Sequence, residues 1–162
     1  MRILFDSKLP QFKAPFGTLV PNQECTLNIH IPSTVRAKDV TVILSYEHGE
    51  TAQLISLNYH MKKGPYDIFR GTFSIPHPGL YFYYFRIENN EGAFKLFKQG
   101  DDTNMEAGEL WQVSCIPADF HTPDWAKGAT IYQVFPDRFN KAGKVDLTGK
   151  LEPYTVHPYW HE

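Results

Sequence analysis

Alternation of apolar and polar residues is the clearest pattern in the first two thirds of the sequence. Leu27, Ile29 and Ile31 alternate with polar neighbours, and Val40 and Leu44 belong to a second segment of the same kind. A period of two is typical of a strand that lays one face on a core. Both segments are therefore predicted to be strands of half-buried sheets.

Five further segments show strand patterns, and clusters of turn-forming residues separate them. They lie at residues 53–59, 68–75, 80–88, 93–97 and 110–116. No stretch of this region keeps the 3.6-residue period of a helix. Seven strands in the first 116 residues predict an all-β fold, an Ig-like antiparallel β-sandwich of two sheets. Its best-defined hairpin joins 80–88 to 93–97 through a loop of about four residues that contains Gly92.

The character of the sequence changes after residue 116. Residues 117–128 contain two prolines and are predicted to be an extended linker, because proline fixes φ and restricts its predecessor. Residues 129–135 are almost continuously apolar, which is typical of a strand buried on both faces in a parallel sheet. The predicted organisation is a sandwich over 1–116, a linker over 117–128 and the start of a different domain over 129–162.

Composition and charge exclude several classes of protein. Three Trp, nine Tyr and twelve Phe make up 15% of the 162 residues, which favours strands. Sixteen basic and eighteen acidic residues leave a net charge of −2 without a block of like charge, so no nucleic-acid partner is expected. The longest apolar run, 80–85, is far shorter than the ~20 residues of a membrane span. Asp6 interrupts the apolar N-terminus too early for a secretory signal, so we expect a cytoplasmic protein unless a signal has been removed.

Cysteine and histidine usage points away from disulfide and metal chemistry. Cys25 and Cys115 are expected to be two ordinary thiols, since no Trp follows the first cysteine as it would in a disulfide-bridged sandwich. His157 and His161 are four residues apart, but a proline follows the first and no Glu stands beside it, so no metal is predicted. The oxygen-rich residues 100–108 are interpreted as a solvated loop rather than a calcium site, because no bidentate ligand has an EF-hand spacing.

One run near the C-terminus is specific. Residues 124–139 read DWAKGATIYQVFPDRF and resemble the segment that opens the catalytic barrel in glycoside hydrolase family 13, the α-amylase family. The likeness is to its neopullulanase, cyclomaltodextrinase and amylopullulanase-like members, whose first barrel strand and following turn look like 131–139. Upstream, FKAPFG at 12–17, YDIF at 66–69 and PGLYFYYF at 78–85 resemble the N-terminal sandwich of these enzymes, which is similar to carbohydrate-binding module family 34.

The resemblance implies that this chain is an N-terminal fragment of a retaining α-glucan hydrolase, an enzyme of carbohydrate metabolism. The family's catalytic carboxylates lie in motifs that include an Asn-His dipeptide and a Gly-x-Arg-x-Asp run, and neither occurs in these 162 residues. No catalytic residue is therefore assigned, and the fragment itself is expected to be inactive. Lys141 stands where many relatives carry an Asn that helps to bind calcium, so no calcium site is expected there and no cofactor is predicted.

Aromatic rings are the expected sugar-binding groups, because their flat apolar faces match the C–H face of a pyranose. The candidates are Trp111, Tyr81, Tyr83 and Tyr84, with Tyr59 as a further one. About half of the residues in each strand must face the core, so a structural role stays open for every one of them.

Three residues near the C-terminus follow from the resemblance to the first barrel strand. It places Tyr132, Asp137 and Arg138 near the floor of the parent enzyme's active site, and Tyr132 is retained as a substrate-binding candidate. Asp137 and Arg138 are instead interpreted as a charge pair that shapes the turn.

Three roles remain for the sandwich. In the first it is a non-catalytic domain that packs on its own catalytic barrel, forms a homodimer, or binds an α-glucan such as starch, pullulan or maltodextrin. In the second it is a freestanding glucan-binding module, and in the third a structural sandwich for protein contacts. The barrel-opening run favours the first role, because an independent module has no use for a buried parallel-type strand.

Overall fold

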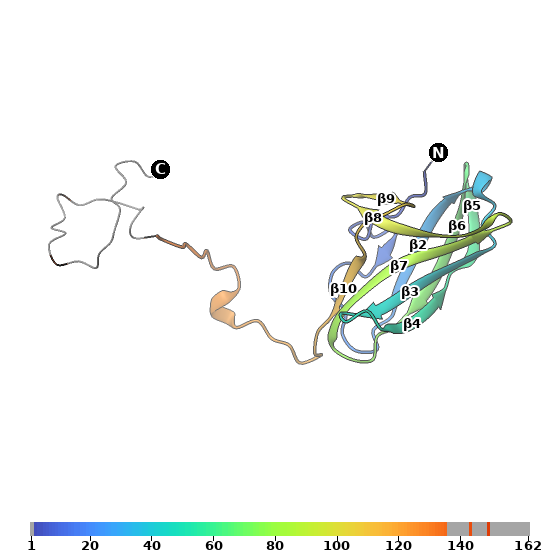
Figure 1. Ribbon diagram of the computed structural model, residues 1–162. Helices are drawn as coiled ribbons and strands as arrows, with labels where there is room; N and C mark the ends of the chain where they lie inside the picture. The colour runs from blue at the N-terminus through green and yellow to red at the C-terminus, as the bar shows by residue number, and fades with distance from the viewer. Residues whose placement is uncertain (1, 136–142, 144–148, 150–162) are drawn as a thin grey trace. The chain divides into compact units, whose positions relative to one another are not determined.

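The chain forms two units, Met1–Phe120 and His121–Glu162. The computed structural model describes residues 2–135 together with Gly143 and Gly149. The first unit is built from antiparallel strands, which Figure 1 shows as two layers. This confirms the predicted all-β, Ig-like sandwich.

Two sheets make up the sandwich. The first, sheet A, has the order β1 (Lys13–Ala14), β2 (Cys25–Pro32), β6 (Tyr66–Phe73) and β5 (Asn58–Lys63). The second, sheet B, has the order β4 (Thr51–Ser56), β3 (Asp39–Tyr46), β7 (Gly79–Asn89), β8 (Gly92–Gln99) and β9 (Asp102–Asn104), and β10 (Trp111–Cys115) pairs with β7. Two short 3-10 helices, η1 (Ser33–Val35) and η2 (Asp124–Ala126), complete the described elements.

The predicted alternation places the apolar residues between the sheets. Leu27, Ile29 and Ile31 of β2 and Val40 and Leu44 of β3 are all buried in one continuous core. Removing such side chains from water is the main stabilising term of a fold of this size. Both expected thiols are confirmed, since Cys25 and Cys115 are buried in the same core and form no disulfide.

The segment predicted as one strand over 53–59 is two strands in different sheets. β4 pairs with β3 in sheet B, and β5 pairs with β6 in sheet A. Leu57 lies between them, buried, with its backbone N–H donating to the carbonyl of Val40 at 2.8 Å. The alternation continues across the crossing, because Leu57 enters the core just as a strand residue would, so the pattern alone does not show the change of sheet.

A glycine on β6 makes room for this crossing. A Cβ added to Gly71 would lie 2.7 Å from the carbonyl oxygen of Ser56 and 3.1 Å from Cδ1 of Leu57. Because both neighbours belong to the crossing segment, the close approach depends on the missing side chain.

The predicted hairpin is confirmed, with a tighter loop. Asn89 is the register partner of Gly92, so only Asn90 and Glu91 connect β7 to β8. The Asn89 Oδ1 accepts hydrogen bonds from the backbone N–H groups of Glu91 at 2.9 Å and Gly92 at 3.1 Å. A side chain that satisfies the turn's own backbone donors explains why two residues are enough. The residues expected to form a loop over 100–108 include β9, which pairs with the end of β8.

The N-terminal segment extends sheet A beyond β1. Leu4 and His30 exchange backbone hydrogen bonds of 2.9 and 3.1 Å, and the Phe12 carbonyl accepts from the Asn28 N–H at 2.8 Å. Lys13 is buried, and its Nζ donates to the carbonyls of Pro15 at 2.9 Å and Gly17 at 3.0 Å, while burial lowers its pKa. The backbone bonds to His30 and Asn28 hold the segment against the edge of sheet A, and the Lys13 bonds fix the loop that follows β1.

An aromatic cluster fills the centre of the sandwich. The Trp111 ring stacks on Tyr83 at 5.8 Å between centroids and meets Phe5 and Phe85 edge-on at 5.1 and 5.3 Å. Phe5 in turn contacts Phe12 at 6.0 Å. Edge-on and offset pairs of this kind add to the free energy gained by burial alone.

The second unit departs from the strand predicted over 129–135. Within the described part of this unit the only regular element is η2, and no strand lies over 129–135. Ile131 is 84% and Phe135 60% exposed. A strand that is apolar on both sides needs neighbouring strands to pair its edges and packed layers to cover both of its faces, and the described part of this unit contains neither. No helix of the described residues has the length and apolar character needed to cross a membrane.

Replacing Gly71 with alanine should destabilise the sandwich. The added methyl meets a backbone oxygen that cannot rotate away, and overpacking of this kind costs about 1–3 kcal/mol. Urea unfolding followed by Trp fluorescence measures the change. Thr72→Ser, at the exposed neighbouring position, serves as control and should stay within about 0.5 kcal/mol of the parent. Equal stability of Gly71→Ala and the parent would contradict the crowding.

Trp111→Ala should lower the free energy of unfolding by about 3–5 kcal/mol, because it opens a cavity among its three aromatic neighbours, Phe5, Tyr83 and Phe85. Trp125→Ala is the matched control, since that ring is 78% exposed in the second unit; it should change stability by less than about 0.5 kcal/mol. Thermal and urea denaturation of the two variants and the parent measure both changes in stability. A Trp111→Ala variant as stable as the control would show that the cluster does not support the core.

Candidate functional site

Three of the predicted sugar-binding residues lie in the core. Trp111, Tyr81 and Tyr83 are only 2%, 3% and 1% exposed. The ring faces of Trp111 and Tyr83 are covered by each other and by the aromatic cluster. Their burial favours the structural role that the sequence left open, and it leaves no ring face for a pyranose.

The two buried tyrosines differ in how their hydroxyl groups are satisfied. The Tyr81 hydroxyl donates to the carbonyl of His77 at 2.9 Å. The Tyr83 hydroxyl has no hydrogen-bond partner among the described residues, and burial raises the pKa of this phenol. Neither hydroxyl is therefore placed to bind a ligand from solvent.

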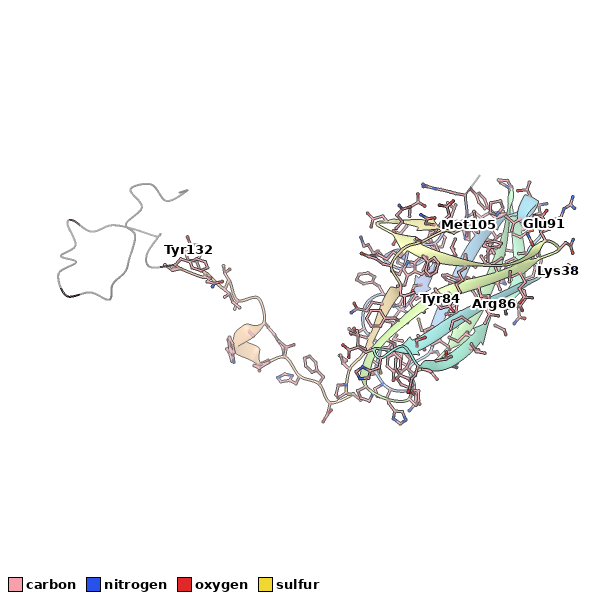
Figure 2. The ribbon with its side chains drawn as sticks, in the orientation of Figure 1. Lys38, Tyr84, Arg86, Glu91, Met105 and Tyr132 are labelled. Carbon is pink, nitrogen blue, oxygen red and sulfur yellow. The ribbon has the colours of Figure 1, made fainter. Side chains whose placement is uncertain are left out.

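Tyr84 differs from its neighbours because it points to the outer face of sheet B. It is half-buried, and its ring lies against Phe97 of β8 with centroids 5.8 Å apart and planes inclined by 28°. The Nζ of Lys95 lies 5.2 Å from the centre of the Tyr84 ring, within the range of a cation–π contact. Figure 2 labels Tyr84 and Arg86, which both lie on β7.

Tyr84 belongs to an apolar row that crosses four strands of sheet B. Ile43 of β3 is the register partner of both Leu54 on β4 and Tyr84 on β7, and Phe97 of β8 stacks on Tyr84. Leu54 is 64% exposed, and the other three are half-buried. We call these four residues, Leu54, Ile43, Tyr84 and Phe97, the outer row.

A polar row lies next to the outer row, two residues further along the strands. Thr41 pairs with both Ser56 and Arg86, and Arg86 pairs with Lys95. Arg86 also forms an ion pair with Glu88. Hydroxyl, guanidinium and ammonium groups beside an aromatic pair supply the hydrogen-bond donors that a sugar needs next to its apolar face.

The remaining predicted residues lie elsewhere. Tyr59 of β5 is 58% exposed on the edge of sheet A and meets Phe69 edge-on. Tyr132 is 75% exposed in the second unit and belongs to no described strand. Asp137 and Arg138 lie outside the described residues, as do His157, His161 and Lys141.

No metal centre is found within the described part of the chain. That part contains no group of three or more His, Cys, Asp or Glu side chains that could hold a metal ion. Asp101 and Asp102 belong to the oxygen-rich segment 100–108. They form ion pairs with Lys8 and Arg2, respectively. The Lys8 ammonium also lowers the pKa of the Asp101 carboxyl, through a hydrogen bond and through its charge.

The sequence left Phe97, Ile43 and Leu54 out of the candidate site. Each lies in a different strand next to an apolar residue that faces the core, and only the register of β4, β3, β7 and β8 brings them beside Tyr84. The sequence did contain one signal for this row. Once the β7–β8 hairpin and its loop length are known, the register places the outward residues of neighbouring strands opposite one another.

Comparison with known proteins gives relatives but no family model, since none matches this sequence. The amylopullulanase of Thermoanaerobacter thermohydrosulfuricus is 25% identical over 175 residues, covering 97% of this chain and 12% of that enzyme. The amylopullulanase of Thermoanaerobacterium thermosulfurigenes is 26% identical over 174 residues, covering 93% of this chain and 9% of that enzyme. The chain thus spans only a small part of the length of these relatives.

A solved structure described as cyclomaltodextrinase shares the fold. It matches 85% of this chain and 23% of its own with a TM-score of 0.51 and 18% sequence identity. The sequence and fold comparisons together confirm the resemblance drawn from residues 12–17, 78–85 and 124–139: this chain is similar, over most of its length, to enzymes of the glycoside hydrolase family 13 kind, and its sandwich corresponds to an N-terminal domain of such an enzyme.

Proposed function

We propose that this chain is the N-terminal part of an α-glucan-hydrolysing enzyme and that its sandwich is a non-catalytic, glucan-binding domain. The similarity to two amylopullulanases over most of the chain supports the first part. The ligand is an α-glucan such as starch, pullulan or maltodextrin. Residues 129–162 are then the beginning of the catalytic barrel, in keeping with the run at 124–139.

The outer row is the observation that carries the binding proposal. Tyr84 and Phe97 place two stacked, half-buried rings on the outer face of sheet B, and together with Ile43 and Leu54 they form an apolar surface on the sheet. A pyranose lays its C–H face on such a surface. Arg86 and Thr41, one row away, supply donors and acceptors for the sugar hydroxyl groups.

A protein contact is the second role that the outer row supports. Leu54 is 64% exposed at the end of the row and has no ring to offer a sugar. Exposed apolar side chains next to polar ones are typical of surfaces that pack on another protein. The barrel of the same enzyme or a second copy of the chain would be the partner in this role.

Tyr84→Ala should weaken binding to α-glucan. An aromatic contact is worth about 0.5–1.5 kcal/mol, so the affinity should fall about two- to tenfold. Affinity electrophoresis of the full chain in gels containing starch or pullulan measures this as lost retardation. Tyr59→Ala is the matched control, because it removes an exposed tyrosine from the other sheet and should keep the parent's retardation.

Two results would contradict this role. If the parent chain runs at the same rate with and without glucan, the sandwich does not bind it. If Tyr59→Ala loses retardation and Tyr84→Ala keeps it, binding takes place away from the outer row. Concentration-dependent dimerisation that Leu54→Lys abolishes, without glucan retardation, would favour the protein contact.

The chain itself should hydrolyse no α-glucan. None of the catalytic motifs expected of the enzyme occurs in its 162 residues, and a retaining glycosidase needs two carboxyl groups about 5 Å apart. Reducing-sugar release from pullulan and soluble starch should equal that of buffer. Release that rises in proportion to protein and survives repurification would show a catalytic site that the sequence does not reveal.

A further inference from the structure

A groove of about 750 Å³ runs over the outer face of sheet A, on the side of the sandwich away from the outer row. Its floor is formed by the outward residues of β2 and β6, where Asn28 pairs with Arg70 and His30 with Ile68. One wall is the N-terminal segment with Pro10, Gln11 and Phe12, and the other is β5. A space of this size suits a ligand of one or two sugar rings.

One part of the groove is aromatic and apolar. The His30 ring lies 4.9 Å from the centre of Phe12 and 6.3 Å from that of Tyr66. Met61 of β5 pairs with Ile68 on the floor. These side chains offer an apolar surface beside polar groups, the combination that recognises a sugar ring.

The polar lining carries positive charge without a carboxylate. Arg70, Lys63, His30 and His60 line the groove, and no Asp or Glu does. Neither Arg70 nor Lys63 forms an ion pair with a carboxylate of the described residues. Two permanent cations without a counter-charge favour an anionic ligand.

Arg70 is held in place by a buried amide. Asn28 is 7% exposed, and its Oδ1 accepts a hydrogen bond from the Arg70 Nε at 2.6 Å, while its Nδ2 donates to the Gln11 carbonyl at 3.0 Å. Because only Nε is used, the terminal amino groups of the guanidinium have no partner among the described residues. A positioned guanidinium with free terminal donors is well suited to the oxygens of a phosphate group.

The two cations lie on either side of His30. Lys63 of β5 is the register partner of Tyr66 on β6. Tyr66 precedes Arg70 by four residues, which separates the two positions by about 13 Å along the strand. Because Asn28 holds the Arg70 guanidinium in its own row, it is the long Lys63 side chain that extends over the row of His30 and Ile68 towards it. Burial and the neighbouring Lys63 charge lower the pKa of His30, as expected where positive groups meet without an anion.

We propose that this groove binds a phosphate monoester of a sugar, with the phosphate held by Arg70 and Lys63 above His30 and the sugar ring against Tyr66 and Met61. The choice of a sugar as carrier of the phosphate rests on the proposed function, whereas the preference for an anion rests on the lining alone. The ligand is a free sugar phosphate or a phosphorylated glucose unit within an α-glucan.

Isothermal titration of the full chain tests the groove with glucose 6-phosphate, glucose and inorganic phosphate as probes. Glucose 6-phosphate should bind at least about tenfold more tightly than either other probe. Arg70→Gln should weaken this binding by at least about tenfold, and Lys63→Gln by about three- to tenfold, since each removes a charge-assisted hydrogen bond. Lys38→Gln is the matched control, because this exposed lysine lies outside the groove, and it should bind like the parent.

If Arg70→Gln fails to fold, Lys63→Gln still tests the proposal. The Lys63 side chain is exposed and forms no ion pair with the described residues, so its replacement should leave the sheet intact. The His30 ring proton resonances give an independent readout. A dianion beside the imidazole favours its charged form, so saturating glucose 6-phosphate should raise the pKa of His30 measured by NMR titration. His60, Tyr66, Lys63 and Arg70 are the other titratable or charged groups that line the groove.

Several outcomes would overturn the proposal. They are an absence of binding, binding that Arg70→Gln and Lys63→Gln leave unchanged, a His30 pKa that ligand does not move, and equal affinity for inorganic phosphate and glucose 6-phosphate. Retardation by phosphorylated but not by dephosphorylated maltodextrin in a Tyr84→Ala background would identify the glucan-bound ester as the source. Because Tyr84→Ala removes the neutral-glucan site without touching the groove, failure of the proposed function and failure of this inference give different results.

Discussion

The orientation of β7 is the constraint on which the rest of the sandwich depends. Tyr83, Phe85 and Ile87 face inward because Trp111 and Phe5 pack on the first two of them. That packing fixes which residues face outward, since side chains on a strand alternate between its faces. Tyr84 is therefore outside for the same reason that Tyr83 is inside. Phe5 extends the effect to the N-terminal segment, which is anchored in the core and so forms one wall of the groove on sheet A.

Much of the fold could be predicted from the sequence because its strands alternate clearly. The inward residues of β2 and β3, the β7–β8 hairpin and the two thiols follow from pattern and composition. The crossing at Leu57 could not be predicted, because a residue that enters the core between two strands has the same polarity as one within a strand. The short strands β1 and β9 have too few residues to show any period.

The candidate sites were harder to predict than the fold for two physical reasons. The run at 80–85 is apolar at every position, so the sequence does not tell which tyrosines face the core; the packing of Trp111 decides it. The groove gathers residues from the N-terminal segment, β2, β5 and β6. Asn28 and His30 occupy the polar positions of an alternating strand, so the sequence does not distinguish the outer face of sheet A from a solvated surface.

The irregular pairing of β5 bears on how copies of this protein associate. Both β4 and β5 lie at open ends of their sheets, and an unpaired strand edge can add a strand from another molecule. The register of β5 shifts between Tyr59 and Met61, and Lys62 and Lys63 follow. A bulge followed by two charges interrupts the regular hydrogen-bonding edge that a neighbouring chain would need. Self-association of the sandwich through the β5 edge, including open-ended stacking into fibrils, is therefore disfavoured.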